Sequence, residues 1–287
     1  MGELSDIGTI KKLIEKTGFS FRRDMGQNFL INPSVCPKMA QNALENAQGV
    51  IEIGAGIGVL TKELAGRAEK VVSFELDEKL IPLLNETLSE FDNVEIINAD
   101  FLKCDIRRII DEKFGSMRIC VCANLPYYIT SPVIMSLLES RIAYDNITVM
   151  VQKEAADRLC AEPGTRQAGA ITAAVSYYSV PQKLFNVSKG SFMPAPKVDS
   201  TVIRLKIREK APVELTDEGF FFSVIKAAFS QRRKTAVNSL SSGLGISKEK
   251  ISEALTNADL SPTARAEELT LNNFAEISNY LYKNQIG

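Results

Sequence analysis

The sequence predicts an α/β protein with a mostly parallel, doubly wound sheet and a small all-α region at its C-terminal end. Three observations support this fold class. From residue 50 onward, short apolar runs alternate with amphipathic helical stretches, and the first run leads into a glycine-rich turn. Beyond residue 212 only helical patterns follow. Alternation of this kind is typical of successive βαβ units, which form parallel sheets of the Rossmann-like type.

The expected strands are apolar and mostly β-branched along their length, as strands buried on both faces are. They cover residues 50–54, 70–74, 94–98, 118–123 and 147–152. Helices are expected between them at residues 59–65, 78–91, 105–113 and 131–140. Two further strand-like segments, residues 183–187 and 200–206, could complete the sheet in antiparallel fashion. Ligands of such sheets bind at the carboxyl ends of the strands.

A charged stretch that contains a proline, residues 208–212, is interpreted as a linker. Beyond it, helices are expected at residues 217–229, 234–240, 248–257 and 267–282. We therefore expect two domains, a larger one of residues 1–212 and a small helical one of residues 213–287.

The composition, with 45% hydrophobic and 24% charged residues, is that of an ordinary globular protein. The chain has no histidine, which excludes histidine acid–base catalysis and the Ser-His-Asp triad. Its five cysteines are scattered and lack metal-ligand spacing, so no metal site or disulfide framework is expected. No run reaches the roughly 20 apolar residues of a membrane span. The charged N-terminal segment lacks a signal-peptide core, so we expect a cytoplasmic protein.

Residues 50–58 (VIEIGAGIG) are predicted to form a buried strand, a glycine-rich turn and the start of a helix. Gly54 and Gly56 let the backbone turn sharply and approach a ligand that a Cβ atom would exclude. Glu75, at the end of the second strand, is suited to accept hydrogen bonds from ribose hydroxyls. These features fit a dinucleotide as well as S-adenosylmethionine, and glycines in such turns are often only structural.

Two details favour S-adenosylmethionine. The glycines follow the spacing GxGxG, whereas the dinucleotide fingerprint is GxGxxG. Glu52, just ahead of the first glycine, would repel a pyrophosphate but not a cationic methionine portion. At the end of the third strand, Asp100 could accept from the adenine amino group of the cofactor while Phe101 packs on the ring. The alternative for that pair is a helix N-cap followed by a core aromatic residue.

Residues 124–130 (NLPYYIT) follow the fourth predicted strand and match the Asn-x-Pro-Tyr motif of methyltransferases that act on an exocyclic amine. The adenine amine is a poor nucleophile because its lone pair is delocalised into the ring. The Asn124 side-chain oxygen and the Leu125 carbonyl could accept from its two hydrogens and point the lone pair at the sulfonium methyl. Pro126 stiffens the turn, and Tyr127 can stack on an extruded base. The alternative is an ordinary strand-ending turn with a buried tyrosine.

Taken together, these segments resemble the KsgA-type ribosomal RNA adenine N6-dimethyltransferase family over nearly the whole chain. Five further segments carry the resemblance: residues 26–30 (GQNFL), 149–159 (VMVQKEAADRL), 192–205 (FMPAPKVDSTVIRL), 229–240 (FSQRRKTAVNSL) and 265–269 (RAEEL). The resemblance implies a Rossmann-like methyltransferase sheet with S-adenosylmethionine as methyl donor. It also implies that residues 1–212 form the cofactor-binding catalytic domain and residues 213–287 a helical domain that binds RNA or the ribosome.

The family resemblance also implies site residues and a substrate. The residues around the cofactor would be Asn28, Leu30, Gly54, Glu75, Asp100 and Asn124. Phe192 would face Tyr127 across the target base. The substrate would be two adjacent adenines near the 3′ end of the small-subunit (16S) RNA, each receiving two methyl groups, and the family also serves ribosome assembly. Two departures are Ala55, where the family often has proline, and Ala168, where an aromatic residue is common.

Because the net charge is −1, RNA binding must rest on local basic patches. The predicted RNA-binding residues are Arg22, Arg23, Lys197, Arg232, Arg233 and Lys234. Lys197 belongs to a cluster with Arg204, Lys206 and Arg208, of which the last three alternate along one face of a strand. Such residues give affinity and register but little sequence information. The alternative for residues 232–234 is a solvated helix face. We expect a monomer whose partner is the 30S particle.

Other functions are left open. The nearest is the large-subunit (23S) adenine methyltransferase of the macrolide-resistance type, which shares the fold and an Asn-x-Pro-aromatic motif. Leu125 and the segment FSQRRK favour the small-subunit enzyme. A DNA adenine methyltransferase is disfavoured because no separate sequence-reading domain is evident. The glycine turn alone would also fit a nicotinamide oxidoreductase, and the protein could act mainly as an RNA-binding assembly factor.

Overall fold

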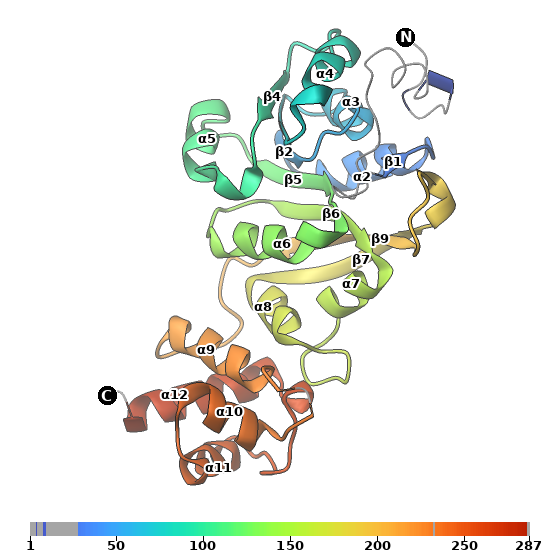
Figure 1. The fold of residues 1–287 in the computed structure, drawn as a ribbon. Coiled ribbons are helices and arrows are strands. Elements are labelled where there is room, and N and C mark those ends of the chain that lie inside the picture. Colours follow the sequence, from blue (N-terminus) through green and yellow to red (C-terminus); the bar gives the residue numbers. More distant parts are fainter. Residues whose placement is uncertain (1–3, 5–7, 10–27, 232, 286–287) are drawn as a thin grey trace. The chain divides into compact units, whose positions relative to one another are not determined.

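Figure 1 shows the computed structural model of the chain, which describes residues 4, 8–9, 28–231 and 233–285. The chain divides into two compact units. The first, called the sheet unit, consists of Met1–Ala156 and Gln182–Ile207. The second, called the helical unit, consists of Asp157–Pro181 and Arg208–Gly287.

A seven-stranded sheet with the strand order β4-β3-β2-β5-β6-β9-β7 forms the centre of the sheet unit. Its strands are β2 (Gly49–Ile53), β3 (Lys70–Glu75), β4 (Val94–Asn98), β5 (Ile119–Asn124), β6 (Asn146–Gln152), β7 (Ser179–Val187) and β9 (Ser200–Ile207). Neighbouring strands from β4 to β6 run parallel, and β9 runs antiparallel to β6. The predicted mostly parallel sheet and its antiparallel completion are therefore confirmed.

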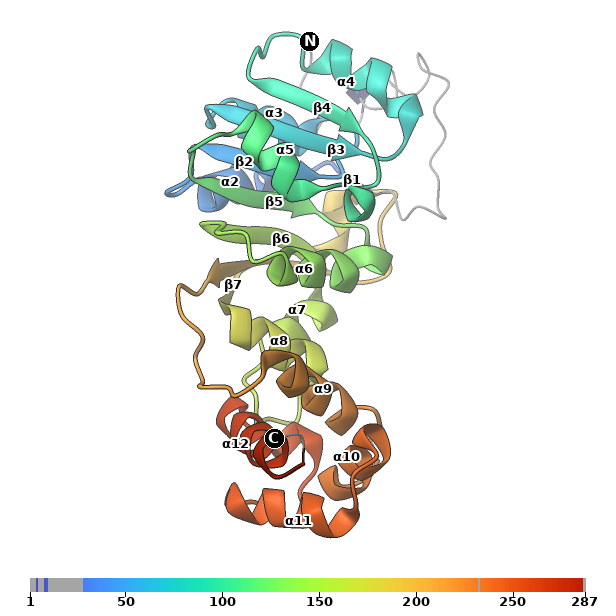
Figure 2. The ribbon, with the colours of Figure 1, turned by 90° about the vertical axis from the view of Figure 1, so that its left-hand side faces the viewer.

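Helices cover both faces of this sheet. The helices α2 (Val35–Ala43) and α3 (Val59–Ala65) share one face, where Met39 and Leu64 join a core with Val50, Val71 and Cys120. Figure 2 shows α5 (Ile106–Lys113) and α6 (Thr130–Glu139) in front of the sheet, on the face opposite α2. The remaining helix of this series, α4 (Ile81–Thr87), follows a short 3₁₀ helix, η2 (Glu78–Leu80).

Two short strands join segments that are far apart in the sequence. Strand β1 (Phe29–Leu30) pairs antiparallel with β8 (Phe192–Met193), so that Leu30 lies opposite Phe192. The Ile31 amide extends this pairing by donating to the Ser191 carbonyl at 2.8 Å. The segment before the sheet is therefore held beside the segment that precedes β9.

Local sequence features explain where several elements begin. Gly49 starts β2 directly against Phe114, and a Cβ atom there would lie 2.5 Å from the Phe114 ring. Gly58 precedes α3 in the left-handed conformation, with φ +89°. Asp105 is the N-cap of α5 and accepts from the Arg108 amide at 3.1 Å, which satisfies one of the free amides of the first turn.

The parallel register brings four strand ends to one edge of the sheet. Ile53 of β2 lies opposite Phe74 of β3, and Glu75 of β3 lies opposite Asn98 of β4. The segments that follow these strands are therefore neighbours, as are the segments after β2 and β5. This edge is where parallel sheets place their ligands.

The helical unit contains α8 (Ala170–Tyr178), α9 (Glu218–Ala228), α10 (Ala236–Leu244), α11 (Lys248–Asn257) and α12 (Leu271–Gln285). Tyr177 of α8 donates to Glu218 Oε2 at 2.9 Å, and its ring lies 5.4 Å from that of Phe221. Residues 157–181 thus pack with the C-terminal helices, whereas the sequence suggested a single division at residue 212. No helix in the described part of the chain is long and apolar enough to cross a membrane.

The left-handed start of α3 gives a stability prediction with a matched control at the other end of the helix. An Ala at Gly58 would be forced into the left-handed region, with its Cβ 3.2 Å from Thr87 Oγ1. We expect Gly58→Ala to lower the free energy of unfolding by about 1–2 kcal/mol. Gly66 has φ −71° and room for a Cβ at 3.7 Å, so Gly66→Ala should be near neutral. Urea unfolding compares the two variants, and equal losses would contradict the prediction.

Candidate active site

A cavity opens at the carboxyl ends of β2, β3, β4 and β5, within the sheet unit. All the residues predicted to bind the cofactor or to act in catalysis line this one cavity. They are Asn28, Leu30, Gly54, Gly56, Glu75, Asp100, Phe101, Asn124, Leu125, Pro126, Tyr127 and Phe192. Residues from six separate segments of the chain therefore meet in one place.

The glycine turn after β2 forms one wall of the cavity. Gly54 and Gly56 have φ values of +83° and +59°, which L side chains rarely adopt. A Cβ on Gly54 would meet nothing within 4 Å, and the residue lines the cavity. The Gly54 and Ala55 amides both donate to the Phe74 carbonyl, at 2.8 and 3.2 Å. The turn is thus fixed against β3 and leaves an open backbone face toward a ligand.

Glu75 joins this turn to the end of β3. Its Oε2 accepts from the Gly56 amide at 2.8 Å, and its Oε1 accepts from the Asp77 amide at 2.9 Å. Burial raises the pKa of the Glu75 carboxyl above its usual value, while the bonds from Asp77 and Gly56 act in the opposite direction. Each oxygen keeps a further lone pair, so the carboxylate can also accept from ribose hydroxyls.

Asp100 and Phe101 show both of the arrangements considered for them. Asp100 is the N-cap of the 3₁₀ helix η3 (Phe101–Lys103), with its Oδ1 accepting from the Leu102 amide at 3.1 Å. Phe101 is buried and packs edge-on against Phe74, with ring centroids 5.3 Å apart. Both residues nevertheless line the cavity. A structural role and a ligand contact are therefore compatible here.

Asn124 ends β5 at the cavity, and its side-chain amide makes no hydrogen bond within the part of the chain that the structure describes. An uncommitted amide beside a cavity is available to a substrate. Leu125 is buried, with 2% of its surface exposed, so its apolar side chain fixes the backbone after Asn124. Pro126 then leads into the 3₁₀ helix η4 (Tyr127–Ile129).

Two aromatic residues line the same cavity. Tyr127 is half-buried, and its hydroxyl lies 3.0 Å from Ser200 Oγ at the start of β9. Phe192 has only 4% of its surface exposed and belongs to the apolar core that also contains Leu30 and Met39. Phe192 therefore serves the core and the cavity together.

Sequence patterns missed several residues of this cavity. Leu76, Leu102 and Tyr128 line it and are 52%, 40% and 59% exposed, which is unusual for large apolar side chains. Leu76 directly follows Glu75, and Leu102 follows Asp100 by two positions, so their nearness to the strand-end acids was a usable signal. Cys36 and Met39 of α2 also line the cavity. Burial raises the pKa of the Cys36 thiol well above its usual range, so this residue is an inert apolar contact.

Glu52 does not play the part that its position suggested. It is fully buried and does not line the cavity, and its Oε2 accepts from Thr61 Oγ1 and Ser73 Oγ, each at 2.6 Å. Burial raises the pKa of the Glu52 carboxyl to about 7. Its carboxyl is bonded to protein hydroxyls and makes no direct contact with a ligand in the cavity. The preference for S-adenosylmethionine therefore rests on the glycine spacing and on the residues that do reach the cavity.

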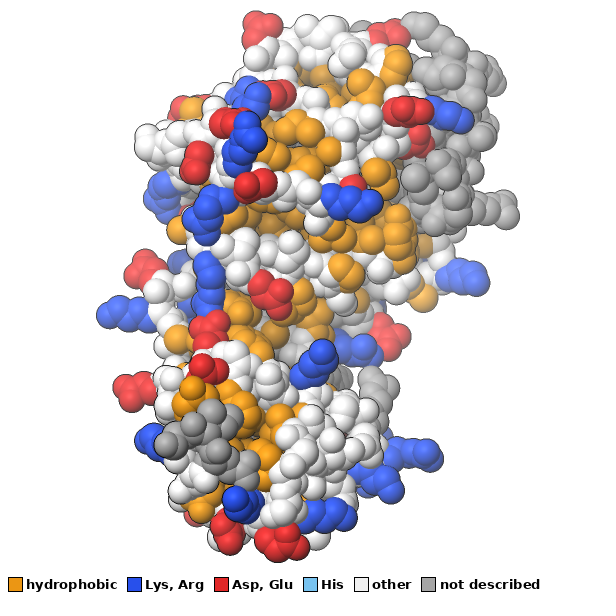
Figure 3. Space-filling model, turned by 60° about the vertical axis from the view of Figure 1, so that its left-hand side comes forward, with side chains coloured by type: hydrophobic (Ala, Val, Ile, Leu, Met, Phe, Trp, Pro, Cys, Tyr) orange, Lys and Arg blue, Asp and Glu red, His pale blue; other side chains and the backbone are white. Residues whose placement is uncertain are grey.

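The predicted basic residues that the structure describes lie at the surface. Lys197, Arg233 and Lys234 are exposed, whereas the predicted Arg22, Arg23 and Arg232 lie outside the described residues. On the face shown in Figure 3, Lys and Arg side chains are interspersed with Asp and Glu side chains.

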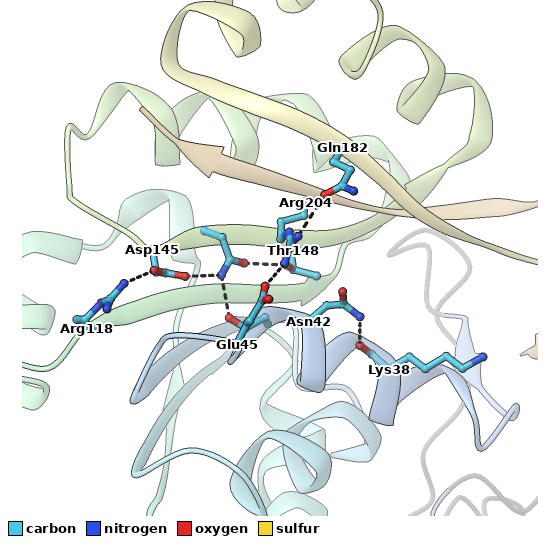
Figure 4. Close-up of polar contacts among 10 residues, drawn as sticks. Lys38, Asn42, Glu45, Arg118, Asp145, Thr148, Gln182 and Arg204 are labelled. Carbon is cyan, nitrogen blue, oxygen red and sulfur yellow. Dashed lines mark hydrogen bonds and ion pairs between the residues drawn. The ribbon is translucent and has the colours of Figure 1, made fainter. Parts of the chain in front are cut away.

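Two arginines of the cluster around Lys197 are already engaged by protein groups. Arg204 forms an ion pair with Glu45, two residues after the end of α2, and a hydrogen bond with Gln182 of β7, as Figure 4 shows. Arg208 donates through Nε to the carbonyls of Ser176 and Ser179, at 3.1 and 3.2 Å. The alternation of basic residues along the strand was visible in the sequence. The groups that accept their hydrogen bonds come from distant segments, so the sequence did not indicate them.

Within the described residues, no group of three or more Cys, Asp or Glu side chains is placed to hold a metal ion. The cavity presents backbone amides, carboxylates, the Asn124 amide and aromatic rings.

The glycine turn after the first strand, the acid at the end of the second and the Asn-Leu-Pro-Tyr segment after the fourth define the class, a Rossmann-like methyltransferase. Residues 18–283 match the family described as ribosomal RNA adenine dimethylase. The chain therefore belongs to the ribosomal RNA adenine dimethylase family.

Relatives and solved structures agree with this assignment. Ribosomal RNA small subunit methyltransferase A of Geobacillus sp. (strain WCH70) is 47% identical over 284 residues, covering 97% of this chain and 98% of that protein. The protein of the same name from Anoxybacillus flavithermus is 48% identical over 277 residues, covering 95% and 94%. A dimethyladenosine transferase from Plasmodium falciparum has a TM-score of 0.71 at 25% identity, covering 89% of this chain and 98% of its own. The 23S rRNA methyltransferase ErmE has a TM-score of 0.68 at 26% identity, covering 88% and 99%.

The two aspartates at consecutive N-caps give a test of cofactor contact. Asp100 lines the cavity, whereas Asp105 caps α5 outside it. Asp→Asn keeps a capping oxygen, so both variants should retain their stability. We expect Asp100→Asn to weaken S-adenosylmethionine binding by about tenfold, as for the loss of a hydrogen bond to a charged group. Asp105→Asn should bind as the unmodified protein does. Isothermal titration with S-adenosylhomocysteine measures both, and equal affinities would remove Asp100 from the site.

Proposed function

We propose that this protein transfers methyl groups from S-adenosylmethionine to the N6 amines of two adjacent adenines near the 3′ end of small-subunit (16S) ribosomal RNA. Each adenine receives two methyl groups. One observation carries the proposal: the uncommitted Asn124 amide at the end of β5 shares a cavity with the glycine turn and with Glu75. A group that can orient an amine therefore lies beside a wall that can bind a nucleoside.

The cavity residues fit S-adenosylmethionine as the methyl donor. The open backbone at Gly54 and Gly56 would approach the methionine portion, Glu75 would accept from the ribose hydroxyls, and Asp100 would accept from the adenine amino group. Asn28, Leu30 and Phe101 complete this wall. When bound, the donor supplies a methyl group on a positively charged sulfur, which is electrophilic without help from a metal.

The protein groups then have to orient a weak nucleophile. The Asn124 side-chain oxygen and the Leu125 carbonyl accept from the two N6 hydrogens and direct the lone pair along the line of attack. Tyr127 and Phe192 hold the base between their rings, and Pro126 keeps the turn stiff. Positioning and fixed dipoles of this kind supply most of the rate acceleration when charge disperses in the transition state. A strong base is not needed, because the amine becomes acidic once it is methylated.

The small-subunit substrate is preferred to the large-subunit one because of the relatives. The chain is 47% and 48% identical to two proteins named small subunit methyltransferase A, but 26% identical to the 23S rRNA methyltransferase ErmE. The shared fold alone does not discriminate between these substrates. Leu125 and the FSQRRK segment support the same choice.

We further propose that the helical unit provides contacts to the RNA or the 30S particle through Arg233 and Lys234, with Lys197 of the sheet unit and Arg22, Arg23 and Arg232 contributing. The protein would act as a cytoplasmic monomer and would take part in small-subunit assembly. Exposed cations of this kind contact phosphates, so the particle's shape rather than its base sequence would supply the specificity.

Replacing Asn124 separates catalysis from binding. We expect Asn124→Ala to lower the rate of methyl transfer to 30S particles by roughly 10²–10³-fold, since one orienting acceptor is lost. Affinity for the particle should change little. Labelling from radioactive S-adenosylmethionine, together with sedimentation of the bound protein, measures the two properties.

Two results would overturn the proposed function. One is labelling confined to large subunits when isolated small and large particles are compared. The other is persistence of dimethyladenine in small-subunit RNA, measured by mass spectrometry, in cells that lack the gene. If Asn124→Ala abolished particle binding as well, an assembly role could not be separated from catalysis.

The basic pair of the helical unit gives a salt-dependence prediction. Arg233→Ala and Lys234→Ala should each reduce the slope of log affinity against log salt by about 1, because each loses one phosphate contact. Lys248→Ala and Lys250→Ala, at exposed positions of the same unit, serve as controls and should leave the slope unchanged. Filter binding of 30S particles over a salt series makes the comparison. Equal slopes in all four variants would assign residues 233–234 to a merely solvated surface.

A further inference from the structure

Tyr127 is attached to the start of β9 by a hydrogen bond between two hydroxyl groups. Its Oη lies 3.0 Å from Ser200 Oγ, and either group can donate. Ser200 is fully buried and lies opposite Gln152 of β6 in the sheet, so the backbone that carries its side chain is held in place. Burial raises the pKa of the Tyr127 phenol, with the Ser200 bond acting in the opposite direction. The phenol therefore remains protonated near neutral pH and can keep this bond.

Ser200 also ends the segment that begins with Phe192. At its start, Phe192 lies opposite Leu30 in the pairing of β8 with β1. Near its end, the Asp199 carbonyl accepts from the Lys153 amide at 3.0 Å, and Asp199 Oδ1 accepts from the Lys189 amide at 2.9 Å. One anchored segment, residues 192–200, thus supplies Phe192 directly and holds Tyr127 through Ser200. Both aromatic rings proposed to hold the target base depend on it.

We propose that Ser200 is a positioning residue that sets the orientation of the Tyr127 ring, and that the second methyl transfer depends on this orientation more than the first. The inference rests on the proposed function and adds to it. Ser200 does not line the cavity and acts only through the tyrosine.

The chemistry of the two transfers explains the difference between them. In each transfer the N6 lone pair forms the new N–C bond while the C–S bond of the donor breaks, and one N6 hydrogen leaves as a proton to water. Unmodified adenine offers two N–H groups to Asn124 and Leu125, whereas N6-methyladenine offers one. With one of these hydrogen bonds gone, stacking contributes a larger share of the alignment. A Tyr127 ring that can rotate therefore harms the second step most.

Two variants test this role, and each removes one hydroxyl group while keeping both rings. We expect Ser200→Ala and Tyr127→Phe to slow the first transfer by about twofold and the second by about five- to tenfold, as for the loss of one hydrogen bond. N6-Methyladenine should accumulate in both. Because the two hydroxyls form one bond, the double variant should resemble the single ones. Ser200→Thr keeps a hydroxyl and should restore dimethylation. Single-turnover reactions on unmethylated 30S particles, analysed by mass spectrometry, give the ratio of mono- to dimethyladenine.

The next residue of β9 provides a matched control. Thr201 is buried, and its Oγ1 donates to Asn186 Oδ1 at 2.9 Å, away from the cavity. Thr201→Val also removes a buried hydroxyl, so it should lower thermal stability while leaving the product ratio unchanged. If Ser200→Ala fails to fold, Tyr127→Phe alone tests the positioning role, since it removes the hydroxyl and keeps the aromatic ring.

The outcomes separate this inference from the proposed function. If the unmodified protein produced no dimethyladenine on 30S particles, the proposed function would fail. If it did, and the folded variants gave an unchanged product ratio or slowed both transfers equally, only the positioning role of Ser200 would be refuted.

Discussion

The hydrogen bond from the Gly56 amide to the Glu75 carboxylate joins the turn after β2 to the end of β3. It exists only because the two strands are parallel neighbours in register, with Ile53 opposite Phe74. It also requires the turn to double back, which the positive φ values of Gly54 and Gly56 allow. It fixes the wall of the cavity that the glycine turn and the end of β3 form together. The carboxyl ends of β4 and β5 meet the same edge, so Asp100 and Asn124 face a space that the turn has left open.

The polar groups of the site fall into two kinds. Glu75 and Asp100 already accept hydrogen bonds from backbone amides, which fixes their orientation before any ligand arrives. Asn124 makes no such bond within the described residues and remains available. Fixed carboxylates suit a ligand that is bound in the same way throughout the reaction. An uncommitted amide suits a group whose hydrogen bonds change during it. The distribution of bonds within the protein therefore agrees with a tightly held methyl donor and a transiently held amine.

Much of the sheet unit could be predicted because its signals are local. The strand Val94–Asn98 and the helix Val59–Ala65 were predicted with the observed bounds, and most other sheet strands with shifts of one residue at their ends. Strand β7 begins at Ser179, four residues before the predicted start at residue 183. Helix α2 was missed, although its buried positions Val35, Cys36, Met39, Ala40 and Ala43 have helical spacing. It precedes the βαβ series, so the alternation of strands and helices did not indicate it. Strands β1 and β8 have two residues each, too few to show any periodicity. Helix α8 was missed as well, because it is buried on almost all sides and has no polar face to show a helical period.

By itself, the sequence determined the fold class, the type of the glycine turn and the Asn-Leu-Pro-Tyr segment, since each depends on residue types at short spacing. Only the tertiary structure decided what these residues touch. It buried Glu52, whose carboxylate accepts from Thr61 and Ser73, although its position just ahead of the turn suggested an electrostatic influence on the ligand. It paired Arg204 with Glu45, which lies 159 residues away in the chain. It brought Ser200 to the hydroxyl of Tyr127, which no spacing in the sequence indicated. Contacts of this kind depend on which strands become neighbours in the folded sheet, and that is settled by the packing of the whole unit.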